Sequence, residues 1–298
     1  MNQKKFKSIY KQSPIALTFI IITSIKCFTI YNLINFIKLE QSTLCYYLCN
    51  IILTGYIILF ILLQSSFLML SIVDPGSLES LNCSVNVPNG FKSTIRYCNK
   101  CIGNKWKPPR AHHCTMCNIC IFRMDHHCIL VNNCIGYSNQ KIYILFLFYS
   151  LCSTIFTVAI SLLLTYKLKL SSNASVHKIT TALIINSIVN IIIFLTAAVF
   201  FSDQIDYITS NSSLVELLSN RRGRNTEFIN NFKVIFGENK LLWFLPTKNS
   251  ANPDFCEELY EIIDYPKSQI SSEIRHADSI DQFKSKLTNI DQKPLKNE

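Results

Sequence analysis

Four long apolar runs dominate the sequence, at residues 14–37, 44–73, 142–166 and 179–201. Each run holds at least the roughly 20 residues that a helix needs to cross a ~30 Å hydrocarbon core. Helices in a large soluble core would keep a polar face, which these runs mostly lack. The pattern therefore predicts an all-α integral membrane protein with four transmembrane helices. Lys26 lies near the middle of the first run, where its amine must reach the interface or meet a polar partner.

Composition and charge agree with a membrane protein. Hydrophobic residues make up 49% of the chain and charged residues 16%, against about 25% charged residues in soluble proteins. Basic residues gather before the first run, between the second and third, and after the fourth, which predicts a cytosolic location for both termini and the central segment. Lysines between the third and fourth runs oppose this pattern. The net charge of +10 can meet anionic lipid headgroups or phosphates. Nucleic-acid binding is not expected, because the sequence shows no basic stripe interleaved with aromatic residues.

The apolar runs and their connections divide the chain into six parts. We expect a cytosolic N-terminus (residues 1–13), a first helix pair (14–73), a cytosolic cysteine-rich domain (74–141) and a second helix pair (142–201). A C-terminal segment packed on the core (202–246) and a disordered tail (247–298) would follow. The tail is charged and rich in Asn, Ser and Lys, without sustained periodicity.

Cysteine and histidine cluster in the central segment. Seven of the thirteen cysteines and four of the six histidines fall between Cys98 and Cys134. A cytosolic segment faces a reducing compartment, and pairs at C-x2-C spacing with nearby histidines favour tetrahedral zinc over disulfides. Two zinc ions need eight ligands, so three of the eleven candidate groups are spare. Zinc would supply the folding energy that this weakly apolar segment lacks.

The tetrapeptide Asp125-His126-His127-Cys128 combines the groups of an activated nucleophile. An imidazole can take the thiol proton, and a carboxylate can orient that imidazole. The thiolate is the form that attacks a thioester, and a neighbouring cation lowers the thiol pKa. Spacing alone also permits Cys128 to be a further zinc ligand or a spare structural thiol.

This segment closely resembles the DHHC family of protein S-acyltransferases, which is named for the tetrapeptide at 125–128. The likeness also covers Cys98-Asn99-Lys100-Cys101, the stretch from Lys107 to Cys114, Cys117, Cys120, and Val131-Asn132-Asn133-Cys134 followed by Asn139. Outside the segment, Asp74-Pro75-Gly76 and residues 231–237 look like two further family motifs, and the likeness spans roughly residues 14–246.

The resemblance implies a ligand set for each of two structural zinc ions. One set would be Cys98, Cys101, His113 and Cys120, and the other would be Cys114, Cys117, His127 and Cys134. Cys128, His126 and His112 are then left without a zinc ion, in agreement with the count of three spare groups.

The resemblance also implies an activity and its partners. Cys128, activated by His126 and Asp125, would take a long-chain acyl group from palmitoyl-CoA and pass it to cysteines of membrane-associated substrate proteins at the bilayer. Arg96, Lys107, Arg110 and His112 would meet the phosphates of the acyl-CoA. The host membrane would be an endomembrane (Golgi, endoplasmic reticulum or vacuole) or the plasma membrane.

The sequence departs from the family pattern at several places. Residues 102–106 enlarge a loop, Ile129-Leu130 replaces the usual Pro-Trp, and Tyr143 replaces a common Phe. In the Thr-Thr-x-Glu motif expected after the last helix, Glu227 is in place, but Arg224 and Asn225 stand where the threonines would be. Two alternative functions stay open at this point, a membrane-anchored RING-like zinc adaptor and an acyltransferase relative that binds partners without activity.

Overall fold

The computed structural model describes residues 3–40, 42–81, 97–101, 106–169, 174–219 and 227–249. These residues form two compact units. Among the described residues, the larger unit holds those up to Pro75 and those from Met124 to 249, and the smaller one runs from Gly76 to Arg123. The predicted tail after residue 249, Arg96, Arg224 and Asn225 lie outside the described residues.

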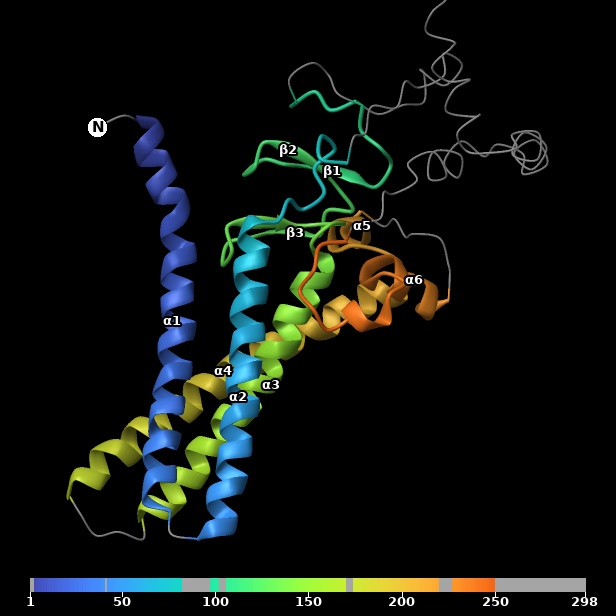
Figure 1. Ribbon diagram of the computed structural model, residues 1–298. Helices are drawn as coiled ribbons and strands as arrows, with labels where there is room; N and C mark the ends of the chain where they lie inside the picture. The colour runs from blue at the N-terminus through green and yellow to red at the C-terminus, as the bar shows by residue number, and fades with distance from the viewer. Residues whose placement is uncertain are drawn as a thin grey trace, which may run out of the picture. The chain divides into compact units, whose positions relative to one another are not determined.

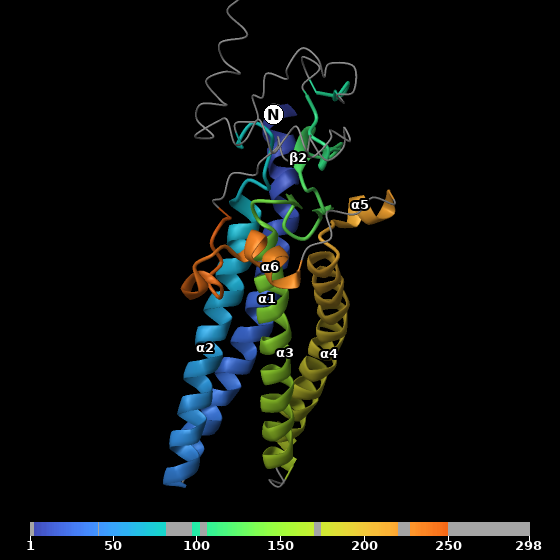
Figure 2. The same ribbon diagram turned by 90° about the vertical axis from the view of Figure 1, so that its right-hand side faces the viewer.

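Four long helices build the larger unit, namely α1 (Gln3–Leu39), α2 (Thr43–Ile72), α3 (Gln140–Lys169) and α4 (Ala174–Thr209). All four are long and apolar enough to cross a membrane, which confirms the predicted multi-pass membrane protein. Figures 1 and 2 show α1, α2 and α3 running alongside one another, with α4 crossing α3.

The last helix continues beyond the apolar run that predicted it. That run ends at residue 201, whereas α4 continues to Thr209 through the polar residues Asp203, Gln204 and Asp206. Gln204 is buried, and its amide is hydrogen-bonded on both sides. The extra helical turns therefore carry a polar side chain into the core.

Short elements complete the two units. The smaller unit holds the antiparallel pair β1 (Ala111–Cys114) and β2 (Ile119–Phe122), and the larger unit holds the pair β3 (His126–Cys128) and β4 (Asn133–Ile135). Asparagine accepts the left-handed backbone that both turns need, at Asn118 (φ 57°) and Asn132 (φ 46°). The C-terminal part of the larger unit contains α5 (Leu214–Leu218), α6 (Phe228–Phe236) and the 3-10 helix η2 (Lys240–Leu242).

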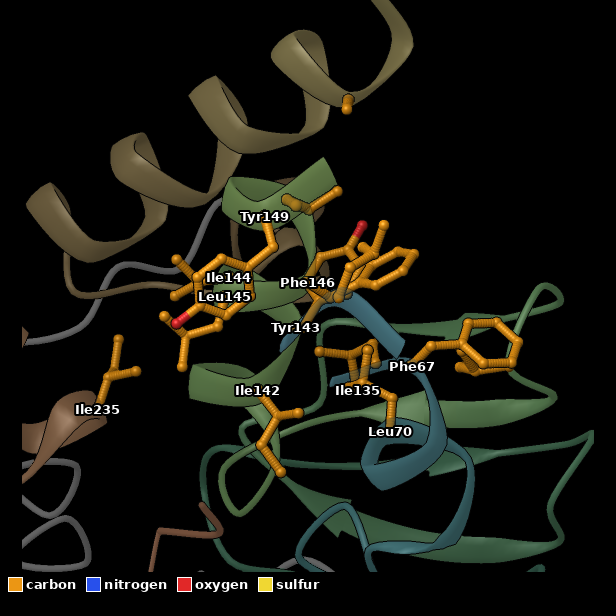
Figure 3. Packing of buried hydrophobic residues seen from close by; sticks show 14 of the residues in the cluster. Phe67, Leu70, Ile135, Ile142, Tyr143, Ile144, Leu145, Phe146, Tyr149 and Ile235 are labelled. Carbon is orange, nitrogen blue, oxygen red and sulfur yellow. The ribbon is translucent and has the colours of Figure 1, made fainter. Parts of the chain in front are cut away.

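Two apolar clusters fill the helix bundle at different levels. The first joins α2, β4, the beginning of α3 and α6, and Figure 3 shows its side chains, among them Phe67, Ile135, Ile142 and Ile235. The second lies further along α3, around Ile160 and Leu164, and joins all four long helices. Both clusters place apolar side chains between helices, where they hold the bundle together by close packing.

A polar layer contains the lysine that the sequence singled out. Lys26 is buried, and its Nζ donates to Oγ1 of Thr157 (3.2 Å) and to Oδ1 of Asn190 (3.0 Å). The hydroxyl of Tyr56 shares a 2.7 Å hydrogen bond with the same Thr157. Nearby, Nδ2 of Asn186 donates to hydroxyls on α1 and α3. Of the two predicted solutions for Lys26, the structure shows the polar partner rather than the interface.

Substitutions in this layer should distinguish the stability effect of losing the acceptor Asn190 from that of losing Lys26 itself. Asn190→Leu removes an acceptor of a buried amine and should cost about 1–3 kcal/mol, seen as a fall of several degrees in the unfolding midpoint in detergent. Lys26→Met removes the donor and the charge together, so it should cost less or stabilise. Asn50→Leu is the matched control, because Nδ2 of Asn50 bonds only to Tyr46 O of its own helix, at an exposed site. A larger loss in Lys26→Met than in Asn190→Leu would contradict this interpretation.

Candidate active site and metal centres

The β3–β4 hairpin carries the predicted nucleophile. Cys128 lies at the end of β3 and pairs with Asn133 of β4. The side chain of Asn133 reaches α2, where Nδ2 donates to the carbonyl oxygens of Leu70 and Val73, both at 2.8 Å. The thiol of Cys128 also packs against the first apolar cluster. The nucleophile is therefore fixed to the end of a spanning helix, beside apolar side chains.

The carboxylate of Asp125 is buried and hydrogen-bonded on both oxygens. Oδ2 lies 3.0 Å from Nδ1 of His126 and accepts from Nε2 of Gln204 at 2.9 Å. Oδ1 accepts from the backbone N–H of Leu214 at 2.8 Å. Gln204 is fixed in turn, because its Oε1 accepts from Nε2 of Gln140 at 3.2 Å. The carboxylate can therefore orient the His126 ring, as the tetrapeptide predicted.

The electrostatics of the pair favour a thiolate beside an imidazolium. Burial by itself would lower the pKa of His126, but hydrogen bonds to Asp125 and Cys128 and their charges together raise this pKa to about 9. Burial would raise the pKa of the Cys128 thiol, but the His126 hydrogen bond, backbone N–H groups and the His126 charge outweigh it and lower the pKa. The arrangement matches that of an activated cysteine nucleophile.

Sequence reasoning missed the groups that hold Asp125 from the C-terminal side. Gln140 and Gln204 gave no signal, because a single glutamine in or beside an apolar run has no characteristic pattern. A signal for the third group exists, since Ser213-Leu214-Val215-Glu216 reads as a helix-start motif and Glu216 Oε2 accepts from the Ser213 N–H at 2.9 Å. The family pattern places such a motif at residues 224–227, whereas the segment that contacts Asp125 begins at Leu214.

Tyr143 keeps an aromatic ring beside the site, although the family commonly has Phe there. Its ring meets that of His126 edge to face, with centroids 5.3 Å apart. The other departure next to the nucleophile, Ile129-Leu130, lies in the hairpin turn with both side chains exposed.

One predicted zinc set comes together within the smaller unit. Cys98, Cys101, His113 and Cys120 place their ligand atoms within 4.8 Å of one another. His113 Nδ1 lies 3.5, 3.4 and 3.8 Å from the sulfurs of Cys98, Cys101 and Cys120, and the last two sulfurs are 3.7 Å apart. Tetrahedral zinc with ordinary bond lengths requires separations of about 3.5–3.8 Å. The residues present therefore fit a Cys3His zinc site.

The second predicted set is formed as two pairs. In the smaller unit, Cys114 and Cys117 bracket the β1–β2 turn, and the Cys117 N–H donates to the Cys114 sulfur at 3.4 Å. In the larger unit, His127 and Cys134 face each other across β3 and β4, with Nδ1 and Sγ 3.4 Å apart. The ligand atoms of each pair lie within 4.8 Å of one another, close enough for two ligands on one zinc ion.

The predicted phosphate contacts belong to the smaller unit. Lys107 and Arg110 lie just before β1, and His112 lies in β1 opposite Ile121. Arg96 is outside the described residues. These four positions stay predictions.

The fold and site define a helical membrane protein that has two Cys/His clusters able to bind zinc and a histidine hydrogen-bonded to a buried carboxylate beside a cysteine. The DHHC palmitoyltransferase family matches residues 92–221. Probable protein S-acyltransferase 13 of Arabidopsis thaliana is 30% identical over 66% of this chain and 72% of its own length. Probable protein S-acyltransferase 12 of the same plant is 29% identical over 74% of this chain and 80% of its own length. Mouse palmitoyltransferase ZDHHC2 is 34% identical over 56% of this chain and 46% of its own length.

The chain belongs to the DHHC family of protein palmitoyltransferases and is an acyltransferase. This membership decides against the RING-like adaptor.

The pH dependence of Cys128 alkylation should show whether His126 stabilises the thiolate. Because the imidazolium of His126 stabilises the thiolate, iodoacetamide should modify Cys128 at a lower pH than it modifies an ordinary thiol of pKa about 8.5. The advantage should disappear as pH rises through about 9, where His126 loses its proton. His126→Ala should move the profile to higher pH and slow alkylation at neutral pH about tenfold or more.

Peptide mapping by mass spectrometry measures Cys128 apart from the other thiols. His177→Ala is the matched control, because His177 is exposed on α4. An unchanged profile in His126→Ala would show that the ring does not activate the sulfur.

Proposed function

We propose that this protein is a protein-cysteine S-palmitoyltransferase that works through an acyl-Cys128 intermediate. It moves a long-chain fatty acyl group from acyl-CoA to cysteine thiols of membrane-associated proteins. The observation that carries the proposal is the hydrogen-bonded series Gln204–Asp125–His126 beside Cys128, at the end of a spanning helix. An acyl chain and a reactive thiol can meet at this location.

The first step forms the acyl-enzyme. The Cys128 thiolate attacks the thioester carbonyl of acyl-CoA, the carbon–sulfur bond to CoA breaks, and His126 gives its proton to the departing CoA sulfur. In the second step, neutral His126 takes the proton of a substrate thiol, and that thiolate attacks the acyl-Cys128 carbonyl. Cys128 leaves as a thiolate beside the imidazolium, so the starting state is restored. Each step exchanges one thioester for another.

The apolar cluster against Cys128 supports a fatty acyl group as the transferred unit. Burial of an acyl chain contributes about 0.8 kcal/mol per methylene, so a long chain dominates the affinity for its donor. Phosphates of the CoA moiety would meet Arg96, Lys107, Arg110 and His112, which supply charge and donors suited to phosphate oxygens. The acyl donor and the protein substrate reach the site from the cytosol, at an endomembrane or the plasma membrane.

Two zinc ions would complete the site without entering the reaction. The first binds Cys98, Cys101, His113 and Cys120, and the second joins Cys114 and Cys117 to His127 and Cys134. The second ion would fix His127, which is the neighbour of Cys128 in β3. The contribution of both ions is folding energy.

Metal analysis tests the two sets separately. The purified protein should hold about two zinc ions per chain, and Cys101→Ser and Cys134→Ser should each lose about one and unfold at lower temperature. Cys152→Ser is the control, because Cys152 lies in α3 outside both sets. If Cys134→Ser kept both ions, the second set would be wrong.

Labelling with a clickable palmitoyl-CoA tests the nucleophile. The wild type should take up the label and lose it in hydroxylamine, which cleaves thioesters. Cys128→Ser should take up none while it keeps its zinc, and Cys152→Ser should label like the wild type. A folded, zinc-loaded wild type without label would instead support the inactive relative.

A further inference from the structure

Residues 240–247 follow the side of α3 rather than leaving the helix bundle. Nζ of Lys141 donates to the carbonyl oxygen of Leu242 at 2.6 Å and to Oγ1 of Thr247 at 2.8 Å. The hydroxyl of Tyr149 donates to the carbonyl oxygen of Phe244. Figures 1 and 2 both show this segment, in orange, alongside the helices.

The position of these contacts along α3 gives their depth. The candidate span Gln140–Leu168 has 29 residues and is about 43 Å long at 1.5 Å per residue. A ~30 Å hydrocarbon core centred on it begins near residue 144. Lys141 therefore lies in the interface, whereas Tyr149 lies about 7 Å inside the hydrocarbon. The segment descends from one level to the other and returns at Thr247.

Irregular backbone at this depth requires its own hydrogen-bonding partners, because lipid offers none. Two of its carbonyl groups, those of Leu242 and Phe244, accept from side chains of α3. Lys141 provides one donor and Tyr149 the other, and both are buried side chains. The Leu242 carbonyl also accepts from the Leu245 N–H at 3.1 Å, so Lys141 adds a second donor there, whereas Tyr149 donates to the deeper carbonyl of Phe244. The two residues thus fasten the turn to α3.

The outward side of the turn is apolar. Leu241 is 87% exposed and Phe244 64% exposed, and Leu242 and Leu245 are also exposed. Trp243 points the other way, with its ring against Phe232 and Nε1 donating to Gly237 O at 2.9 Å. The ring of Phe244 is 6.5 Å from that of Phe148 on α3. The exposed apolar side chains therefore continue the apolar surface of a spanning helix.

We propose that residues 241–245 enter the bilayer as a short re-entrant turn, with the side chains of Leu241 and Phe244 against lipid acyl chains. The turn fastens the C-terminal segment to the membrane independently of the four spans. This goes beyond acyl transfer, because it concerns a lipid contact rather than the reaction. Lys141 and Tyr149 are the residues that permit the insertion.

Photocrosslinking in nanodiscs tests the insertion on the full-length protein. Benzoylphenylalanine is placed at 241 or 244, in phosphatidylcholine doped with a lipid whose acyl chain ends in an alkyne. Position 192 is the positive control, since Ile192 is exposed within α4, and position 218 the negative one, since Leu218 is exposed on α5 outside the spans. Lipid adducts at 241 and 244 should come within about threefold of 192 and exceed 218 about tenfold, as expected for side chains inside the hydrocarbon core.

Variants of the two donors show whether the carbonyl contacts hold the turn. Lys141→Met and Tyr149→Phe should each lower the adduct at 244 several-fold and leave the adduct at 192 unchanged. If Lys141→Met fails to fold, as judged by zinc content, Tyr149→Phe tests the same point by removing one oxygen. Adducts at 192 without adducts at 241 and 244, or crosslinks from 244 to a second copy of the chain, would overturn the proposal.

Discussion

The hydrogen bonding of one buried carboxylate organises the larger unit. Asp125 follows the smaller unit in the chain and meets partners from β3, from α4 and from the residue that begins α5. A buried charge without such partners would be strongly unfavourable. Three parts of the larger unit are therefore required to meet at this residue: the end of α4, the C-terminal segment and the β3–β4 hairpin. The same contacts that stabilise the carboxylate also orient the ring next to Cys128.

Two groups of polar side chains lie within the spans, the layer around Lys26 and the pair Gln140 and Gln204, and they have different structural roles. The layer around Lys26 joins all four long helices deep in the bundle, between apolar clusters, and its partners are neutral oxygens. Gln140 and Gln204 lie at the membrane edge and connect the spans to Asp125. The first feature fixes how the helices pack, and the second transmits that packing to the site of the reaction.

What the sequence predicted correctly was local in the chain. The apolar runs gave the four helices. The C-x2-C spacings gave a metal-binding segment, the family resemblance gave its ligand sets, and the tetrapeptide gave the His126–Asp125 pair. The rest depends on contacts between distant segments. Gln204 lies 79 positions from Asp125, and the partners of Lys141 lie 101 and 106 positions away, at Leu242 and Thr247. Apolar periodicity contains no information about such pairings.

The attachment of Asn133 to the last turn of α2 means that this helix sets the height of Cys128 relative to the bilayer. Because the two hydrogen bonds end at Leu70 and Val73, the height of the sulfur above the bilayer centre follows the length and tilt of one span. Membranes differ in hydrocarbon thickness by a few Å, and helices adjust to them by tilting. The thickness of the host membrane thus becomes a physical variable that sets how far the Cys128 sulfur lies from the lipid headgroups.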